Sequence, residues 1–487
     1  MGAAATTRAR FTLGVTGVVV LLLCMAAAPA RASKSEWSLF EDHTALVQSG
    51  VKKRISTLNE IKGLGADTLR IEFKWNEIAP KPQDKTKPKF DAADPAAYAG
   101  ALDAFPGFGQ YDDLVQRATA MGFRILITIT GDAPRWATAG GKGSSFATAN
   151  WGVSAGEYGK FAAAVAKRYS GKFGGLPAVY YYSIWNEPNH KQFIKPQSSA
   201  PAIYRGLVDA GVPAIRANGP KAAKVFVGET APVGRPGKVI GPRAFFQKWL
   251  CLNKRFKRIK TGGCAKFKKV DADGYAHHPY GPVDLVPKKA DIINLLAIPR
   301  LASFLDAAAR AGRLPGHLPI YDTEFGLQSN PPDPSVSTTP SRQAQLINEK
   351  EEYSYKFGRL KSYSQYLLFD DPARKGPRSQ RYAGFQTGLR FANGKPKPAL
   401  GAYRLPIVVH KRGRGVLVWG RVRPGTGSRY VQLQRNGQND GKRLKTNSHG
   451  YFSVKRPKAG NYRFRAYDGP GSGGNLIGTS RTASPIP

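Results

Sequence analysis

The stretch Ile-Trp-Asn-Glu-Pro-Asn at residues 184–189 places a carboxylate at the end of a predicted strand. The preceding run over residues 179–184 is apolar, rich in aromatic and β-branched side chains, and free of breakers, which is typical of a buried strand. Pro188 ends this strand because proline has no N–H to donate to a neighbouring strand. Glu187 is therefore expected at the mouth of a sheet.

A second carboxylate stands in the same position further along the chain. The apolar run at residues 318–321 is followed by Asp-Thr-Glu-Phe-Gly at residues 322–326, so Glu324 also follows a predicted strand. Two glutamates at the carboxyl ends of two strands are the groups that glycoside hydrolysis requires. The alternative interpretation is two ordinary strand-end glutamates held in ion pairs.

Strand and helix patterns alternate over most of the chain. This alternation predicts an α/β fold, a (β/α)8 barrel over residues 33–404. From residue 405 the apolar runs become short and close together, which predicts a small all-β immunoglobulin-like sandwich over residues 405–487 with a disordered tail from Thr482. The eight barrel strands are expected at residues 37–40, 68–75, 124–130, 179–184, 224–228, 270–276, 318–321 and 363–369.

The motif at residues 185–189, taken together with Thr-Glu-Phe-Gly at residues 323–326, resembles the clan A retaining glycoside hydrolases. This clan includes the family 5 cellulases and the family 39 xylosidases and iduronidases. The resemblance covers about residues 35–404 and implies a (β/α)8 barrel. It also implies that Glu187 is the acid/base and Glu324 the nucleophile.

Four further positions match the clan and imply contacts with the nucleophile or the sugar. They are Arg70, Asn186, His278 and Tyr280. The alternative for Arg70 is a structural ion pair with Glu72 or another acid, and the alternative for His278 is its neighbour His277.

Aromatic and acidic side chains near other strand ends are candidates for sugar contacts. Trp75, Trp136 and Trp185 could stack on sugar rings or pack inside the barrel, and Asp132 and Glu229 could bind hydroxyl groups. The sequence departs from the clan at strand eight, where residues 363–371 contain no tryptophan. Candidates to replace that tryptophan are Tyr366 and Phe369, and Asp370 is a candidate substrate contact.

The N-terminal residues 1–32 are typical of a secretory signal peptide, with Arg8 and Arg10 before an apolar run and small residues near the expected cleavage site. Its removal takes away Cys24 and leaves Cys251 and Cys264. In an oxidising compartment these two are expected to form a disulfide. We therefore predict a secreted protein with no transmembrane segment in the mature chain.

The chain has 74 Lys and Arg against 33 Asp and Glu, a net charge of +41. Such a charge attracts anionic polymers of the cell envelope or matrix, although it also suits a general trend to basic composition. No motif for specific nucleic-acid binding, no metal site and no cofactor is predicted. The leading hypothesis is a secreted retaining β-glycosidase that acts on a polysaccharide or glycoconjugate; the alternatives are a non-catalytic glycan-binding protein and a transglycosylase.

Overall fold

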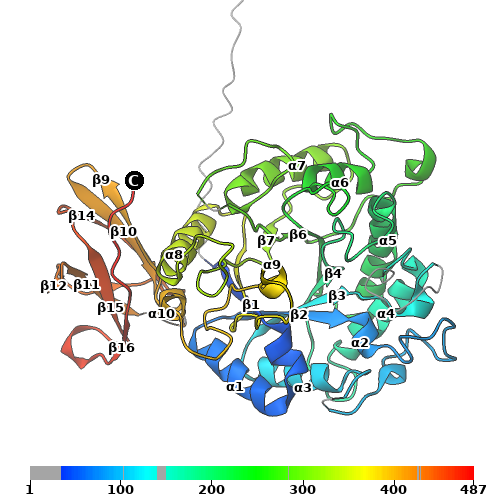
Figure 1. Ribbon diagram of the computed structural model, residues 1–487, viewed down its shortest axis with the longest axis horizontal. Helices are drawn as coiled ribbons and strands as arrows, with labels where there is room; N and C mark the ends of the chain where they lie inside the picture. Colours follow the sequence, from blue (N-terminus) through cyan, green and yellow to red (C-terminus); the bar gives the residue numbers. More distant parts are fainter. Residues whose placement is uncertain (1–34, 103, 140–149, 283, 425–426, 428) are drawn as a thin grey trace, which may run out of the picture.

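A computed structural model describes residues 35–102, 104–139, 150–282, 284–424, 427 and 429–487. The predicted signal peptide lies outside these residues. The centre of the molecule is a sheet of eight parallel strands surrounded by helices (Figure 1). The strands are β1 (Trp37–Glu41), β2 (Thr68–Lys74), β3 (Arg124–Thr130), β4 (Tyr181–Ile184), β5 (Lys224–Thr230), β6 (Gly274–His277), β7 (Ile320–Asp322) and β8 (Ser362–Tyr366).

The sheet closes into a barrel between β7 and β8. The strands pair in the order β7-β6-β5-β4-β3-β2-β1-β8. At the seam, the backbone N–H of Ile320 donates to the carbonyl of Arg359 (3.0 Å), and the N–H of Lys361 donates to the carbonyl of Ile320 (2.8 Å). The predicted (β/α)8 barrel is thus confirmed.

Each strand is followed by at least one helix that covers the outside of the barrel (Figure 1). The longer helices are α1 (Gly50–Gly63), α3 (Gly109–Ala120), α4 (Ala155–Arg168), α5 (Ala200–Asn218), α6 (Pro242–Trp249), α7 (Ile298–Arg310), α8 (Pro340–Lys356) and α10 (Pro398–Arg404). Two short helices, α2 (Trp75–Ile78) and α9 (Arg378–Arg381), lie in connections.

The alternation of side chains along β2 explains how the barrel combines an apolar outer face with a charged interior. Successive side chains of a strand point to opposite faces. Leu69, Ile71 and Phe73 face the helices and belong to the main apolar core. The charged residues between and after them, at positions 70, 72 and 74, point to the lumen. This one strand therefore supplies side chains to both the core and the site.

The C-terminal region forms two antiparallel sheets around a separate apolar core. The strands are β9 (Ile407–Arg412), β10 (Gly415–Arg421), β11 (Tyr430–Arg435), β12 (Gln438–Asn439), β13 (Leu444–Lys445), β14 (Tyr451–Arg456), β15 (Tyr462–Tyr467) and β16 (Leu476–Thr479). The prediction of a disordered tail is wrong, because Ala483 pairs with Tyr462 and Ile486 pairs with His410. The tail therefore adds backbone pairs to this region.

The sandwich lies against α8 and α10 (Figure 1) and is joined to the barrel by a buried polar contact. Arg423 binds both carboxylate oxygens of Glu351 on α8, at 2.5 and 3.0 Å, and Arg421 binds Glu351 at 3.3 Å. Both arginines also donate to the hydroxyl of Ser38 on β1. These groups come from the start of β1 and from α8, away from the carboxyl ends of the strands.

The disulfide between Cys251 and Cys264 is present, as predicted, and closes the basic loop after α6. In the part of the chain that the structure describes, no helix has the length and apolar character to cross a membrane. The long connection after β2 contains α2 and a 3-10 turn, Pro95–Tyr98, and its Tyr98 is buried against Phe161.

Candidate active site

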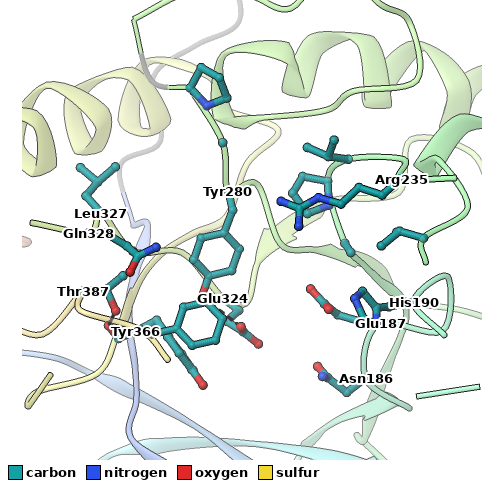
Figure 2. A pocket seen from close by; sticks show the side chains of 18 of the residues that line it. Asn186, Glu187, His190, Arg235, Tyr280, Glu324, Leu327, Gln328, Tyr366 and Thr387 are labelled. Carbon is teal, nitrogen blue, oxygen red and sulfur yellow. Dashed lines mark hydrogen bonds between the residues drawn. The ribbon is translucent and has the colours of Figure 1, made fainter. Parts of the chain in front are cut away.

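A cavity of about 850 Å³ opens at the carboxyl ends of the barrel strands, where active sites of this barrel are found. Its lining includes Asn186, Glu187, Tyr280 and Glu324. Figure 2 shows Glu187 and Asn186 on one side of this cavity and Tyr280 and Tyr366 on the other, with Glu324 between them. A pocket of this size accommodates a small ligand.

The backbone around Glu187 is held in an unusual conformation. Trp185 and Glu187 both have positive φ angles, 63° and 36°. A non-glycine residue in this region costs about 1–3 kcal/mol, so the neighbouring packing must enforce it. Trp185 supplies that packing: it is fully buried, contacts Tyr158 edge to face, and donates from Nε1 to the carbonyl of Phe193 (3.0 Å). The backbone turn made by these two residues thus directs Glu187 into the cavity while Trp185 stays in the core.

Arg70 ties four strand ends together beneath the cavity. Its Nη1 lies 3.1 Å from Oε2 of Glu324 and 2.5 Å from Oε2 of Glu41. Its Nη2 lies 2.7 Å from Oδ1 of Asn186 and 3.3 Å from Oε2 of Glu229. Arg70 therefore pairs with other acids than Glu72, which pairs with Lys74, and it supports Glu324 directly.

His278 lies between the two candidate catalytic carboxylates. Its Nδ1 is 3.1 Å from Oε1 of Glu187 and 3.5 Å from Oε2 of Glu324. Its Nε2 is 2.7 Å from Oε2 of Glu229. Tyr280 donates its hydroxyl to Oε1 of Glu324 at 3.0 Å. The side chains of Glu187 and Glu324 therefore meet at one nitrogen, although they come from different strands.

The alternative histidine has another environment. His277 is fully buried, with Nδ1 2.8 Å from the hydroxyl of Thr230 and Nε2 2.7 Å from the carbonyl of Ile293. Burial lowers the pKa of His277 to about 3, so its ring stays neutral. His277 fixes the end of β6, and His278 is the histidine that faces the carboxylates.

Burial and charge act in opposite directions on the groups around Arg70. Burial lowers the pKa of His278, but Glu324, Glu187 and Glu229 outweigh it and raise that pKa well above its usual value. Burial raises the pKa of Glu229, yet Arg70 and His278 outweigh it and bring that pKa to about 2. His278 is thus a cation, and Glu229 is the permanent anion behind it.

Burial raises the pKa of both carboxylates that share Nη1 of Arg70. Burial raises the pKa of Glu324 against the opposing effects of His278 and Arg70. Burial raises the pKa of Glu41 well above its usual value, and Arg70 opposes it. Glu41 also ends β1 with only 2 % of its surface exposed. Arg70 opposes this effect of burial on both carboxylates, and His278 opposes it on Glu324 alone.

Glu41 and Glu229 complete the cluster in ways that sequence patterns did not specify. Glu41 was not predicted, although a carboxylate ending the first strand was the available signal. Glu229 was predicted as a hydroxyl contact, but it is fully buried beneath His278 and also accepts from the hydroxyl of Thr323 (2.8 Å). Glu229 orients its neighbours and does not reach the cavity.

Three predicted sugar contacts do not border the cavity that the described residues form. Trp75 is fully buried and stacks on Phe161, with ring centroids 5.3 Å apart. Trp136 packs edge to face on Trp75 and donates to the carbonyl of Pro80. The carboxylate of Asp132 accepts from Asn150 at 2.5 Å. Position at a strand end did not determine which way these side chains point.

Aromatic side chains other than tryptophan line the cavity near β8. Tyr366 borders the cavity, and Phe385 packs on it edge to face, with centroids 5.0 Å apart. Phe385 was not predicted; it is 37 % exposed, which is unusual for a phenylalanine. Phe369 instead lies under the Lys53 ammonium, and Asp370 forms a buried ion pair with Lys397 (2.7 Å). Tyr366 is therefore the strand-eight aromatic group of this site.

Comparison with known families identifies the barrel. The profile of the family described as Cellulase (glycosyl hydrolase family 5) matches residues 31–357. The chain belongs to glycosyl hydrolase family 5. The matched span contains both candidate catalytic glutamates and all the residues that contact Arg70. No curated protein matches the chain by sequence.

Solved structures share the fold at low sequence identity. A glucosidase from Croceicoccus marinus has a TM-score of 0.51 and 11% identity, covering 89% of this chain and 95% of its own. A monomeric β-xylosidase from Caulobacter crescentus has a TM-score of 0.50 and 15% identity, covering 88% and 95%. A family 39 glycoside hydrolase from Bacteroides cellulosilyticus has a TM-score of 0.50 and 16% identity, covering 86% and 79%. At these identities the likeness concerns the fold alone.

Proposed function

We propose that this family 5 protein is a secreted retaining β-glycosidase that hydrolyses O-glycosidic bonds of a polysaccharide or glycoconjugate by double displacement. The observation that supports this most directly is the position of His278 Nδ1, 3.1 Å from Glu187 and 3.5 Å from Glu324. The separation between the Glu187 and Glu324 oxygens next to this nitrogen cannot exceed the sum of the two distances. That limit favours the roughly 5–5.5 Å separation of retaining enzymes over most of the roughly 6.5–9.5 Å range of inverting ones.

In this proposal, Glu324 attacks the anomeric carbon while Glu187 protonates the leaving oxygen. Arg70, His278 and the hydroxyl of Tyr280 favour the ionised form of the attacking carboxylate and fix its direction. Esterification removes the charge of Glu324. Glu187 then acts as the base that activates water for the second displacement.

Two variants test the proposal. Glu187→Gln and Glu324→Gln are compared with the wild type on aryl β-glucosides, β-xylosides, β-mannosides and β-galactosides. Loss of general-acid catalysis lowers turnover by about 10²–10⁴-fold, and Glu324→Gln removes the nucleophile. Glu60→Gln is the matched control, since Glu60 pairs with Arg390 on the outside of the barrel. Activity retained in both site variants would exclude the proposed mechanism.

The stereochemistry of the first product tests the retaining course. Proton NMR within the first minutes of hydrolysis is expected to show the β-anomer before it equilibrates. An added alcohol separates hydrolysis from transglycosylation by the fraction of alkyl glycoside formed. Binding of glycans without turnover by the wild type would instead support the non-catalytic alternative.

Export rests on the N-terminal sequence and is consistent with the disulfide, which forms in oxidising compartments. Fusion of residues 1–40 to a reporter tests it: the reporter is expected outside the cytoplasm, with the fused residues shortened at a site near residue 32. Charge reversal of Arg8 and Arg10 in the same fusion is the control and is expected to reduce export.

We also propose that the sandwich adheres to anionic polymers. Residues 405–487 contain 16 Lys and Arg against two Asp, and Lys411, Arg412 and Arg414 are exposed together on the β9–β10 hairpin. Charge reversal of these three is expected to lower the salt concentration needed for elution from a sulfated-dextran column. Reversal of exposed Lys254, Arg255 and Lys257 on the barrel is the control; an equal effect would assign adhesion to total charge.

A further inference from the structure

The cavity wall beside Glu187 carries one cationic side chain that the proposed chemistry does not use, and two more cations lie on the segments next to it. Arg235 lines the cavity and is exposed, and Figure 2 shows its guanidinium directed inward on the same side as Glu187 and His190. Lys191 and Lys238 are exposed on the adjoining segments. Burial first, and then the charges of these three cations, lower the pKa of His190 against the effect of Glu187. The four groups therefore share one electrostatic environment.

The segment that carries Arg235 is fixed by the loop after β4. Asn189 is fully buried, donates from Nδ2 to the carbonyls of Ala231 (3.0 Å) and Ile240 (2.9 Å), and accepts at Oδ1 from the N–H of Ala231 (2.9 Å). The turn itself is closed by two backbone bonds between Arg235 and Val239, at 2.9 and 2.8 Å. Arg235 is thus presented beside Glu187 by a built turn rather than by a free loop.

The acidic groups of the cavity are engaged elsewhere. Glu72 pairs with Lys74 (3.7 Å), and Asp284 pairs with Arg342 (3.2 Å). Within the described ranges of the chain, no carboxylate lies within ion-pair distance of Arg235, Lys191 or Lys238. This wall consequently presents unneutralised positive charge to whatever occupies the space next to Glu187.

The occupant of that space follows from the role of Glu187. A general acid lies next to the leaving oxygen, so the departing sugar occupies the side of the cavity that Glu187 and Arg235 share. We propose that this wall is a subsite for a leaving-group sugar that carries a negative charge, a carboxylate or a sulfate ester, with Arg235 as its main contact. A guanidinium binds such groups with two parallel hydrogen bonds. The inference rests on the proposed function, because that function defines the leaving-group side.

Paired aryl glycosides test this subsite. The 3-carboxyphenyl, 3-sulfophenyl and neutral 3-carbamoylphenyl β-glycosides place an anion, or its uncharged analogue, where the leaving sugar lies. Arg235→Gln is expected to lower kcat/KM about three- to tenfold for one or both anionic substrates, as for a partly exposed ion pair, and to leave the carbamoyl substrate within about twofold. The substrate that responds identifies the preferred group as a carboxylate or as a sulfate ester, for which the sulfonate is the analogue.

Arg255→Gln is the matched control, since it removes the same charge from an exposed position in the loop after α6. It is expected to change none of the three substrates. Equal losses in Arg235→Gln and Arg255→Gln, equal losses for charged and neutral substrates, or no loss would overturn the subsite.

Binding of the same compounds to Glu324→Gln separates this inference from the proposed function. Weaker calorimetric binding of the anionic glycosides when Arg235→Gln is added, without turnover in the wild type, would keep the anion subsite and reject the hydrolase. Turnover in the wild type without any effect of Arg235→Gln in kinetics or binding would keep the hydrolase and reject the anion subsite.

Discussion

Two buried clusters of arginine and glutamate occupy opposite ends of the barrel. At the mouth, Arg70 contacts Glu41, Glu229 and Glu324. At the other end, Arg421 and Arg423 contact Glu351. Both clusters are almost completely excluded from solvent, so burial of charge alone does not distinguish a catalytic group from a structural one.

The clusters differ in their balance of positive and negative groups and in their access to a cavity. The mouth has more carboxylates than cations and borders a cavity of about 850 Å³. The interface has more arginines than ionised carboxylates and is sealed between α8, β1 and the sandwich. In the sealed cluster the two arginines bind Glu351 and Ser38 across the interface, and Nε of Arg421 donates to the carbonyl of His449 within the sandwich. In the open cluster, Glu187 and Glu324 line the cavity, and this access to a ligand is the feature that indicates chemistry.

The largest effect is expected at the sealed cluster. Glu351→Gln leaves Arg421 and Arg423 buried without their anion, and breaking a buried pair costs about 3–5 kcal/mol. Guanidinium denaturation followed by tryptophan fluorescence measures this loss, because Trp419 lies next to Tyr355 of α8. Glu349→Gln, on the same helix but paired with the half-exposed Arg342, is expected to cost less than about 1 kcal/mol. Activity on aryl glycosides should be unchanged in both; a loss of activity in Glu351→Gln would contradict the separation of the clusters.

A smaller effect, now on catalysis, is expected from Glu229→Gln at the open cluster. Removing the anion behind His278 lowers the pKa of that histidine and shifts its ring between Glu187 and Glu324. A displacement of this kind costs about 10²-fold in turnover. The alkaline limb of the pH profile of kcat/KM should lie at lower pH in this variant than in the wild type, since His278 loses its proton at lower pH. An unshifted profile would assign Glu229 to stability alone.

The third effect concerns pH and the interface. Burial raises the pKa of Glu36, next to Ser354 and Tyr451, to about 8. Between its ordinary pKa and 8 the folded protein holds a proton that the unfolded chain lacks, so stability falls as pH rises through that range. Glu36→Gln cannot lose this proton. Between pH 6 and 8 its free energy of unfolding should therefore fall by about 2 kcal/mol less than that of the wild type. Denaturation curves at the two pH values measure it, and parallel declines in both proteins would be inconsistent with a protonated Glu36.

The smallest effect is expected at the aromatic rim of the mouth. Phe385→Ala removes an exposed ring beside Tyr366 and should raise KM about threefold to tenfold, as for a loss of roughly 1 kcal/mol of ring contact. Phe105→Ala is the control, because Phe105 is 45 % exposed and does not line the cavity. Equal KM values in the two variants would remove Phe385 from the site.

Local patterns predicted the elements better than the directions of their side chains. Apolar runs placed all eight barrel strands, although β6 is confined to Gly274–His277, later and shorter than its run. Two cysteines left after the expected cleavage were sufficient for the disulfide. The same reasoning left open whether Trp75 and Trp136 contact sugar or pack in the protein, and the structure shows that they pack. The direction of an aromatic side chain near a strand end depends on its neighbours in space.

The sequence by itself determined the barrel and the two glutamates at the ends of β4 and β7, because strand periodicity and short motifs are local properties of the chain. Tertiary structure alone decided that His278 joins those glutamates, that Glu229 stands behind it, and that Arg235 is held beside Glu187. Contacts between residues far apart in the chain depend on barrel closure and on the clamping of one loop by another. Those long-range relations leave no periodic signal in the sequence.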